Sequence, residues 1–282
     1  MLREELLRRF HSHPLIGQHF GFDKLADKFC LIFFWPKMLE DMKRIWQDCE
    51  VCWKVKHQPS NLAATNTKTI PKPEGIWETL NADYIQLEDH LHVLVIIDEY
   101  SRFVYTAVTK RQDQNTTLLQ LMKCFSTFGF PKVLRTDGGS GFIGNKVLKY
   151  LKSFNVTHYV SLPHNHTSNA FAERFNCTIR KAIRAQPDLS YTDAVYTLTY
   201  AYNRTKHSLT DYPPCYFILN TTDKFSNKIA IYSFLCGLKD IKFGRTEFSE
   251  LQPKKNRKIL SAEMFMMKRV LYKKLHHTSY KN

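Results

Sequence analysis

The chain has 282 residues, of which 43% are hydrophobic and 13% aromatic, so it can bury a core and is not disordered throughout. Its 41 lysines and arginines exceed its 26 acidic residues and give a net charge of +15, which suits a polyanionic partner such as nucleic acid. Apolar runs are far shorter than the roughly 20 residues that span a bilayer, and seven cysteines, two in a CxxC pair, favour a metal site over a disulfide framework. We therefore expect no membrane partner.

Residues 1–57 are expected to form a small helical domain. Pro36 suits the first position of a helix, and apolar residues follow it at helical spacing, namely Leu39, Met42, Ile45, Trp46 and Cys49. Residues 58–75 contain Ser, Asn, Thr and Pro with little periodicity, which predicts a linker.

A second domain is predicted over residues 76–222, where strand-like segments come first and then alternate with helical ones. The expected strands cover residues 80–87, 90–97, 101–109, 131–136 and 156–162. The expected helices cover residues 115–128, residues 145–154 and a long segment after Ser168. This order predicts an α/β fold, with a mixed sheet covered by helices. Residues 223–282 are basic and irregular, which is typical of a linker.

Histidines and cysteines in the first domain have the spacing of a zinc site. His19 and Cys49 are separated by 29 residues, and Cys49 forms a CxxC pair with Cys52. Two imidazoles and two thiolates suit a closed tetrahedral Zn²⁺ site, and so small a helical unit would depend on the metal for its stability. The remaining ligand is His11 or His13, which leave seven or five residues before His19. The alternative is a pair of core cysteines with unrelated surface histidines.

Three acidic residues have surroundings that indicate a second metal site. Asp83 lies inside an apolar strand pattern, and Asp137 ends the strand 131–136 just before two glycines that allow a sharp turn. Glu173 lies near the start of the long helix, with 35 residues between it and Asp137. A carboxylate inside a strand is costly to bury without a partner, and three that converge at a sheet end would bind Mg²⁺ or Mn²⁺.

The long helix is expected to be amphipathic. At about 100° per residue, one stripe holds Glu173, Cys177, Arg180 and Arg184, and the opposite side holds Phe171, Phe175, Ile179 and Ala182. The apolar side would pack on the sheet. The acid would then share the outward face with two guanidinium groups that can pair with DNA phosphates. The alternative is a solvated helix face, which is what most charged stripes are.

Several motifs resemble those of integrases from gypsy-type long-terminal-repeat retrotransposons and retroviruses, over roughly residues 1–222. The HHCC zinc module of that family has counterparts in His11-Ser-His-Pro14, Phe34-Trp-Pro36 and Cys49-Glu-Val-Cys52. Its ribonuclease H-like catalytic core has counterparts in Ile97-Asp-Glu-Tyr-Ser101, Thr136-Asp-Gly-Gly139 and Ala172-Glu-Arg-Phe-Asn176. Val270-Leu-Tyr-Lys-Lys274 resembles the first strand of the family's C-terminal barrel, so residues 223–282 are expected to hold the start of an incomplete domain.

The resemblance implies a catalytic role for the three acids. Asp83, Asp137 and Glu173 match the family's D,D-35-E signature, and by resemblance they would bind two Mg²⁺ or Mn²⁺ ions. The implied activity is 3′-end processing and strand transfer of DNA into target DNA. One departure lies beside the site, where Ala170 stands in place of the family's usual glycine.

The resemblance also bears on the zinc ligands and the DNA contacts. It aligns His11 rather than His13 with the first ligand and makes Gln18 an inserted residue. Asn169 and His164 precede the long helix, and they are expected to contact DNA together with Arg180 and Arg184 on that helix.

Partners and location follow from the same resemblance. We expect a protein of the nucleus, and also of cytoplasmic particles if it comes from a mobile element, that binds element ends and target DNA as a homo-oligomer. A host-domesticated integrase that binds DNA without catalysis is the alternative function. A cut-and-paste transposase is a further one, which the zinc pattern and the 35-residue spacing disfavour.

Overall fold

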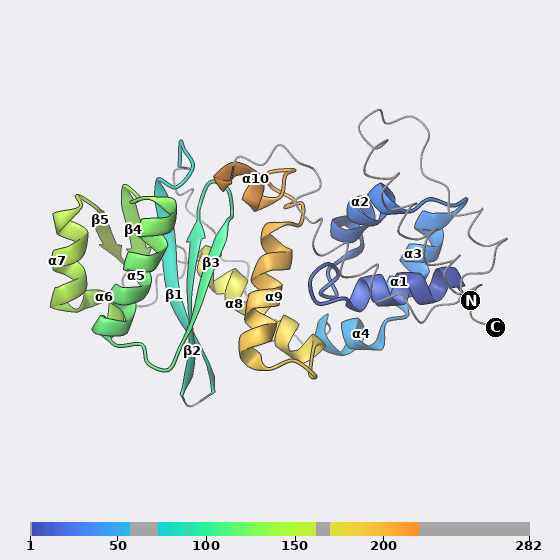
Figure 1. Cartoon of the computed structure of the whole chain (residues 1–282), viewed down its shortest axis with the longest axis horizontal. Coiled ribbons are helices and arrows are strands. Elements are labelled where there is room, and N and C mark those ends of the chain that lie inside the picture. Colours follow the sequence, from blue (N-terminus) through green and yellow to red (C-terminus); the bar gives the residue numbers. More distant parts are fainter. Residues whose placement is uncertain (1, 57–72, 89, 162–169, 220–282) are drawn as a thin grey trace, which may run out of the picture.

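The computed structural model describes residues 2–56, 73–88, 90–161 and 170–219, and Figure 1 shows two parts side by side. One part holds the helices from the start of the chain, and the other holds a five-stranded sheet with helices on both faces. Within these residues, no helix has the length and apolar character needed to cross a membrane. Residues 223–282 and most of the linker predicted over residues 58–75 lie outside the described residues, so these domain boundaries stay predictions.

The N-terminal part is helical, as predicted, and consists of α1 (Leu2–Ser12), α2 (Phe22–Ile32), α3 (Met38–Gln47) and α4 (Glu50–Lys56). Apolar side chains of the first three helices form one core, whose members with at most 1% exposure include Leu6, Leu7, Phe10, Leu25, Phe29, Met42 and Ile45. This core is small, which is the situation in which a bound metal adds most to stability.

The start of α3 differs from the prediction. Lys37 adopts a left-handed backbone with φ of 62° before the helix, so the first helical residue is Met38 and not Pro36. The residues that α3 buries are Met38 and, as predicted, Met42, Ile45 and Trp46. Leu39 lies about 100° round the helix from Met38, and its side chain is 49% exposed.

The second part contains a mixed sheet, as predicted. Its strands are β1 (Thr79–Glu88), β2 (Leu91–Asp98), β3 (Val104–Thr109), β4 (Val133–Thr136) and β5 (Thr157–Val160). They lie in the order β3-β2-β1-β4-β5, with β1–β2 and β2–β3 antiparallel and β1–β4 and β4–β5 parallel. The predicted strand 101–109 begins later, because the Asp98 carboxylate accepts hydrogen bonds from Ser101 N at 2.9 Å and Ser101 Oγ at 2.6 Å and holds a turn there.

Helices cover both faces of the sheet. The helices α5 (Gln114–Phe128), α6 (Ser140–Ile143) and α7 (Asn145–Ser153) pack on the face that carries Leu80, Ala82, Leu94 and Ile96. The helices α8 (Ala170–Ala185) and α9 (Tyr191–Asn203) pack on the other face, which carries Ile85, Val93, Val95 and Ile97. The short helices α6 and α10 (Pro214–Ile218) and the helix α9 are additional to the predicted elements.

The N-terminal part packs against α8 and α9 of the sheet part. Side-chain hydrogen bonds join Gln18 Nε2 to Thr197 Oγ1 at 3.3 Å and Lys28 Nζ to Thr205 Oγ1 at 2.7 Å. Phe20 contacts the apolar cores of both parts. The helical part is thus fixed on the helix that carries the predicted catalytic glutamate.

One edge of the sheet is closed by a side chain. Asn203, at the end of α9, accepts a hydrogen bond from Val104 N at 2.9 Å and donates one to Val104 O at 2.7 Å. The amide thus takes the place of a neighbouring strand at the start of β3, and it is 4% exposed. This contact ties α9, and through α9 the N-terminal part, to the sheet.

Replacing Asn203 with Ala should therefore lower the free energy of unfolding by about 2–4 kcal/mol, because two buried backbone groups would lose their partners. Urea unfolding followed by circular dichroism measures this loss. The control is Asn145→Ala at the start of α7, where the asparagine is exposed and the change should be under about 0.5 kcal/mol. Equal effects of the two substitutions would contradict the role of Asn203.

Candidate functional site

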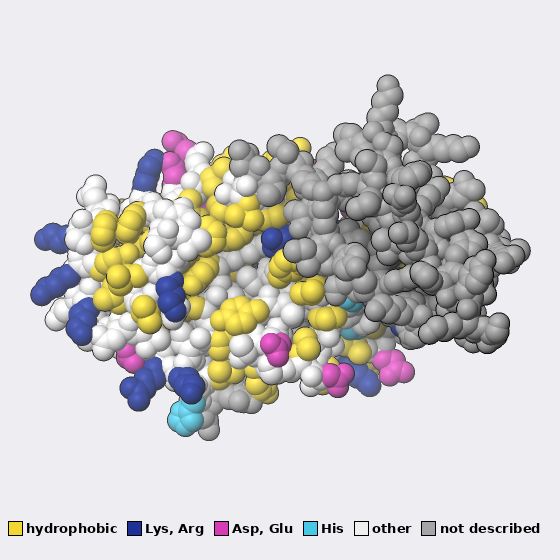
Figure 2. All heavy atoms as spheres, in the orientation of Figure 1, with side chains coloured by type: hydrophobic (Ala, Val, Ile, Leu, Met, Phe, Trp, Pro, Cys, Tyr) yellow, Lys and Arg dark blue, Asp and Glu magenta, His cyan; other side chains and the backbone are white. Residues whose placement is uncertain are grey.

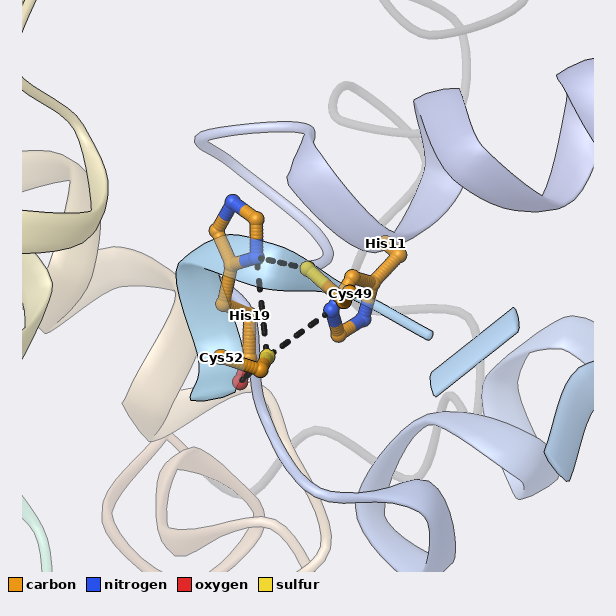
Figure 3. Close-up of side chains that lie close together, drawn as sticks. All are labelled: His11, His19, Cys49 and Cys52. Carbon is orange, nitrogen blue, oxygen red and sulfur yellow. Dashed lines mark hydrogen bonds between the residues drawn. The ribbon is translucent and has the colours of Figure 1, made fainter. Parts of the chain in front are cut away.

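Four side chains of the helical part converge on one point (Figure 3). His11 lies in the last turn of α1, His19 in the turn before α2, Cys49 between α3 and α4, and Cys52 in α4. Their ligand atoms all lie within 4.8 Å of one another. His11 Nε2 is 3.1 Å from Cys52 Sγ, and His19 Nδ1 is 3.5 Å from Cys49 Sγ and 3.7 Å from Cys52 Sγ.

These distances fit a zinc site. Ligands bonded tetrahedrally at about 2.0–2.3 Å from Zn²⁺ would stand roughly 3.3–3.8 Å from one another. The nitrogen–sulfur distances of 3.1, 3.5 and 3.7 Å lie in or near that range. Two imidazoles and two thiolates are also a donor set that structural zinc sites use.

The turn between α1 and α2 decides which histidines meet. Its Gly17 has no room for a side chain, since a Cβ there would stand 2.1 Å from a backbone oxygen of α1. Gln18 and His19 adopt positive φ angles of 47° and 51°. His13 accepts a hydrogen bond from the backbone of this turn at its own Nδ1. The structure thus brings His11, and not His13, to the two cysteines.

The three predicted carboxylates come from β1, from the end of β4 and from the first turn of α8. Parallel pairing aligns Ala82 with Thr136, the last residue of β4, so the residues that follow them, Asp83 and Asp137, lie at the same point of the sheet. α8 packs across the face of β1 and β2 and brings Glu173 to this point. Asp137 is exposed, and the other two acids are half-buried.

The charges of these acids affect one another. Burial raises the pKa of Asp83 to about 6, together with the negative charges of Asp137 and, less strongly, Glu173. Hydrogen bonds to the Asp83 carboxylate from Tyr84 N at 2.9 Å and Asn176 Nδ2 at 2.8 Å oppose the shift. A bound cation would relieve this repulsion, and carboxylate oxygens are the ligands that Mg²⁺ and Mn²⁺ prefer.

The carboxylates are more widely spaced than the zinc-type ligands. Among the residues that the structure describes, the histidine–cysteine cluster is the one group of three or more potential ligands within 4.8 Å of one another. The acid group, which consists of Asp83, Asp137 and Glu173, does not form a second group of this kind in the described part of the chain.

Asn176 is a site residue that sequence reasoning missed. Its side chain is 6% exposed, and its amide donates to Asp83 Oδ2. Its Oδ1 is buried and has no hydrogen-bond partner in the described part of the chain. The signal in the sequence is its position three residues after Glu173, which places it beside that acid on a helix. The contact with β1 is a long-range one that this spacing does not reveal.

The packing face of α8 agrees with the prediction. The side chains that α8 buries against the sheet, at most 5% exposed, are Ala172, Phe175, Ile179 and Ala182, and Phe171 packs partly buried against the same core. Arg180 and Arg184 are exposed on the outward side. His164 and Asn169, the other predicted DNA contacts, lie outside the described residues.

Without Mg²⁺ or Mn²⁺, Asp83→Asn should stabilise the fold at pH 7 more than at pH 4. Because the pKa is raised from 3.8 to about 6 in the fold, ionised Asp83 destabilises the protein above pH 6, and this penalty vanishes as the pH falls to about 4. The advantage of the variant should grow by on the order of 2–3 kcal/mol between pH 4 and pH 7. Urea unfolding at both pH values measures it, with Asp188→Asn as an exposed control, and an advantage that does not change with pH would contradict the assignment.

Two family models match the chain. The model for the integrase zinc binding domain matches residues 1–58, and the model for the integrase core domain matches residues 70–166. The two models together cover more than half of the chain, and they include the histidine–cysteine cluster and two of the three acids.

Similar proteins include viral polyproteins. The Pro-Pol polyprotein of feline foamy virus is 27% identical over 236 residues, which are 80% of this chain and 20% of the polyprotein. The Pro-Pol polyprotein of simian foamy virus type 3 is 23% identical over 185 residues, which are 64% of this chain and 16% of the polyprotein. The chain thus spans about a fifth or less of the length of these relatives.

Matching solved structures include an intasome and an integrase catalytic core domain. A chain of the simian T-cell lymphotropic virus intasome, in complex with PP2A regulatory subunit B56 gamma, is 17% identical, with a TM-score of 0.49 over 65% of this chain and 68% of that one. The HTLV-2 integrase catalytic core domain, in complex with magnesium, is 16% identical, with a TM-score of 0.44 over 51% of this chain and 98% of that one. From the family models and the architecture, a ribonuclease H-like core preceded by an HHCC zinc-binding domain, the chain belongs to the family of retroviral-type integrases.

Proposed function

We propose that this chain is a metal-dependent DNA integrase, which cuts DNA near a 3′ end and joins that end to target DNA. The observation that supports this most directly is the meeting of Asp83 with Asp137 and Glu173 where β4 ends beside β1, and there burial and the neighbouring charges raise the pKa of Asp83 to about 6. Carboxylates held together against their own repulsion are typical of functional sites that bind cations.

In this proposal the three acids would hold two Mg²⁺ or Mn²⁺ ions, which supply the activation of the attacking oxygen and the stabilisation of the leaving oxygen at phosphorus. Asn176 would keep the Asp83 carboxylate oriented through its hydrogen bond to Oδ2. The backbone N–H of Gly139 donates to Asp137 Oδ1 at 3.1 Å and would orient that carboxylate in the same way. No side chain needs to form a covalent bond with DNA.

DNA would approach along α8. Arg180 and Arg184 are exposed and follow Glu173 along the helix, at a spacing that allows guanidinium groups to pair with successive phosphates of a DNA end. Joining two ends of one element at one target needs two such sites, so we propose that the chain acts as a homo-oligomer. Its location in the nucleus stays a prediction.

Zinc would have a structural role. His11, His19, Cys49 and Cys52 would hold the ion and so connect α1 to the end of the helical part. Cys52 lies on α4, and a cavity of about 340 Å³ between this helix and α8 is lined by residues of both, among them Cys52 and Ala182. Zinc binding would therefore stabilise the surface on which α8 rests.

The catalytic proposal is tested by metal-dependent cutting and joining of a branched oligonucleotide. The wild type should react with Mn²⁺ or Mg²⁺, and Glu173→Gln should lower the rate at least about 100-fold, because the substitution removes a metal ligand. The control is Asp188→Asn, which removes an exposed acid beyond the end of α8 and should leave the rate within about twofold.

Wild-type activity that survives in Glu173→Gln would reject the role of these acids. An inactive wild type that is folded, zinc-loaded and still binds DNA would favour the alternative of a DNA-binding protein without catalysis.

The zinc ligands are tested by metal content and stability. His11→Asn should lose the one zinc ion per chain and the helical signal of the N-terminal part, because a small core folds only weakly without its metal. His13→Asn is the matched control and should keep both. Zinc content by mass spectrometry and circular dichroism give the two readouts, and zinc loss in His13→Asn alone would reverse the assignment.

A further inference from the structure

A cavity of about 340 Å³ lies between the helical part and the helices α8 and α9. Its walls are mainly apolar. Phe20 and Val55 line it from the helical part, and Ala182, Ala185 and Leu198 line it from α8 and α9. Cavities of about 300–1,000 Å³ with apolar walls and a few polar groups are typical of small-molecule sites.

One of the polar groups is the ammonium of Lys24, which lines the cavity from α2. In Figure 2, lysine and arginine side chains stand out from the surface at the end of the molecule that holds α7. Lys24 is instead half-buried, and it forms no ion pair with another described residue. Its Nζ lies 5.4 Å from the ring centre of Phe20 and 5.7 Å from that of Tyr202. Burial lowers the pKa of this amine.

Positive charge is in excess around Lys24. Burial lowers the pKa of Lys28 on the same helix to about 7, and the charges of Arg204 and Lys24 add to this shift. Burial also lowers the pKa of His207 to about 4, together with the charges of Lys24 and Arg102, so this imidazole is neutral at pH 7. The cations of this region therefore repel one another in surroundings that screen charge poorly.

The acids near α2 do not balance this charge. Asp27 pairs with Lys206 at 3.5 Å, and Lys206 also pairs with Asp211 at 3.2 Å. Asp23 lines the cavity, but it is exposed and forms no ion pair with Lys24. An anion in the cavity would relieve the repulsion among the cations, just as a cation would relieve the repulsion within the acid group.

We propose that this cavity binds a small organic carboxylate, whose apolar body fills the space between the two parts and whose charged end pairs with Lys24. Ser208 also lines the cavity, and its hydroxyl can donate a hydrogen bond to the same carboxylate. Because the walls come from both parts, the bound molecule would hold the helical part against α8 and α9. This site is independent of the proposed catalysis.

The test uses the full zinc-loaded chain, with octanoate as the probe and octanol as its uncharged analogue. Isothermal titration calorimetry should show one octanoate bound per chain. Octanol should bind about tenfold more weakly, because a hydroxyl carries no charge to pair with the ammonium. Lys24→Met should weaken octanoate binding about tenfold and should leave octanol binding within about twofold of wild type.

The matched control is Lys43→Met on α3. Lys43 also lies over an aromatic ring of the helical part, 5.5 Å from the ring centre of Phe22, but it does not line the cavity. Its substitution should leave octanoate binding within about twofold of wild type. A second variant, Ala185→Phe, fills the cavity and should remove the binding of both probes. Circular dichroism and zinc content check that each variant is folded.

A wild type without saturable octanoate binding would overturn the proposal, and so would equal losses in Lys24→Met and Lys43→Met. Octanoate binding that survives in folded Ala185→Phe would also overturn it, because the probe would then lie elsewhere. Inorganic phosphate that displaces octanoate at a similar concentration would show a site for any anion and reject the apolar body. If Ala185→Phe does not fold, the comparison of the two lysine variants decides.

Discussion

The parallel pairing of β1 with β4, over four residue pairs, determines where the acid group forms. Because Ala82 pairs with Thr136, the next residue of each strand is an aspartate, and the two carboxylates meet at one point of the sheet. Glu173 and Asn176 reach this point because α8 buries an apolar stripe against β1 and β2. A shift of one residue in either strand would send one aspartate to the opposite face, and the acid group would be lost.

The N-terminal part depends on the same arrangement. It rests on α8 and α9, where Gln18 and Lys28 donate hydrogen bonds to Thr197 and Thr205 and Phe20 contacts both apolar cores. The turn that delivers Gln18 to this interface also delivers His19 to the histidine–cysteine cluster. Gln18, which the resemblance treats as an inserted residue, therefore takes part in joining the two parts.

Burial and mutual repulsion make the acid group favourable for binding a cation and unfavourable for the stability of the fold. Asp83 lies partly inside the fold beside two further acids, and its raised pKa reflects the free energy that the fold gives up to hold it there. The basic side chains of α7 and of the connection between β3 and α5 add positive charge on one side, and the arginines of α8 add it on the other. In the proposed function, Arg180 and Arg184 would guide a DNA end to these acids.

Local patterns carried most of the information that was available in the sequence. Periodicity was sufficient for the main strands and helices and for the packing face of α8, because apolar residues recur at the repeat of each element. Motif spacing was sufficient to name the acids and the cysteines, since metals require particular donors in particular numbers. The mixed sheet could likewise be predicted from the order of strands and helices.

Contacts between residues far apart in the chain were decided only in the tertiary structure. The choice of His11 over His13 depends on a left-handed turn at Gln18 and His19. Neither residue is a glycine, so the sequence gives no sign of their positive φ angles. The role of Asn176 depends on the distance between α8 and β1, and the closure of β3 by Asn203 depends on where α9 ends. The physical reason is that spacing along the chain fixes the direction of side chains within one element, whereas packing of whole elements fixes which side chains meet.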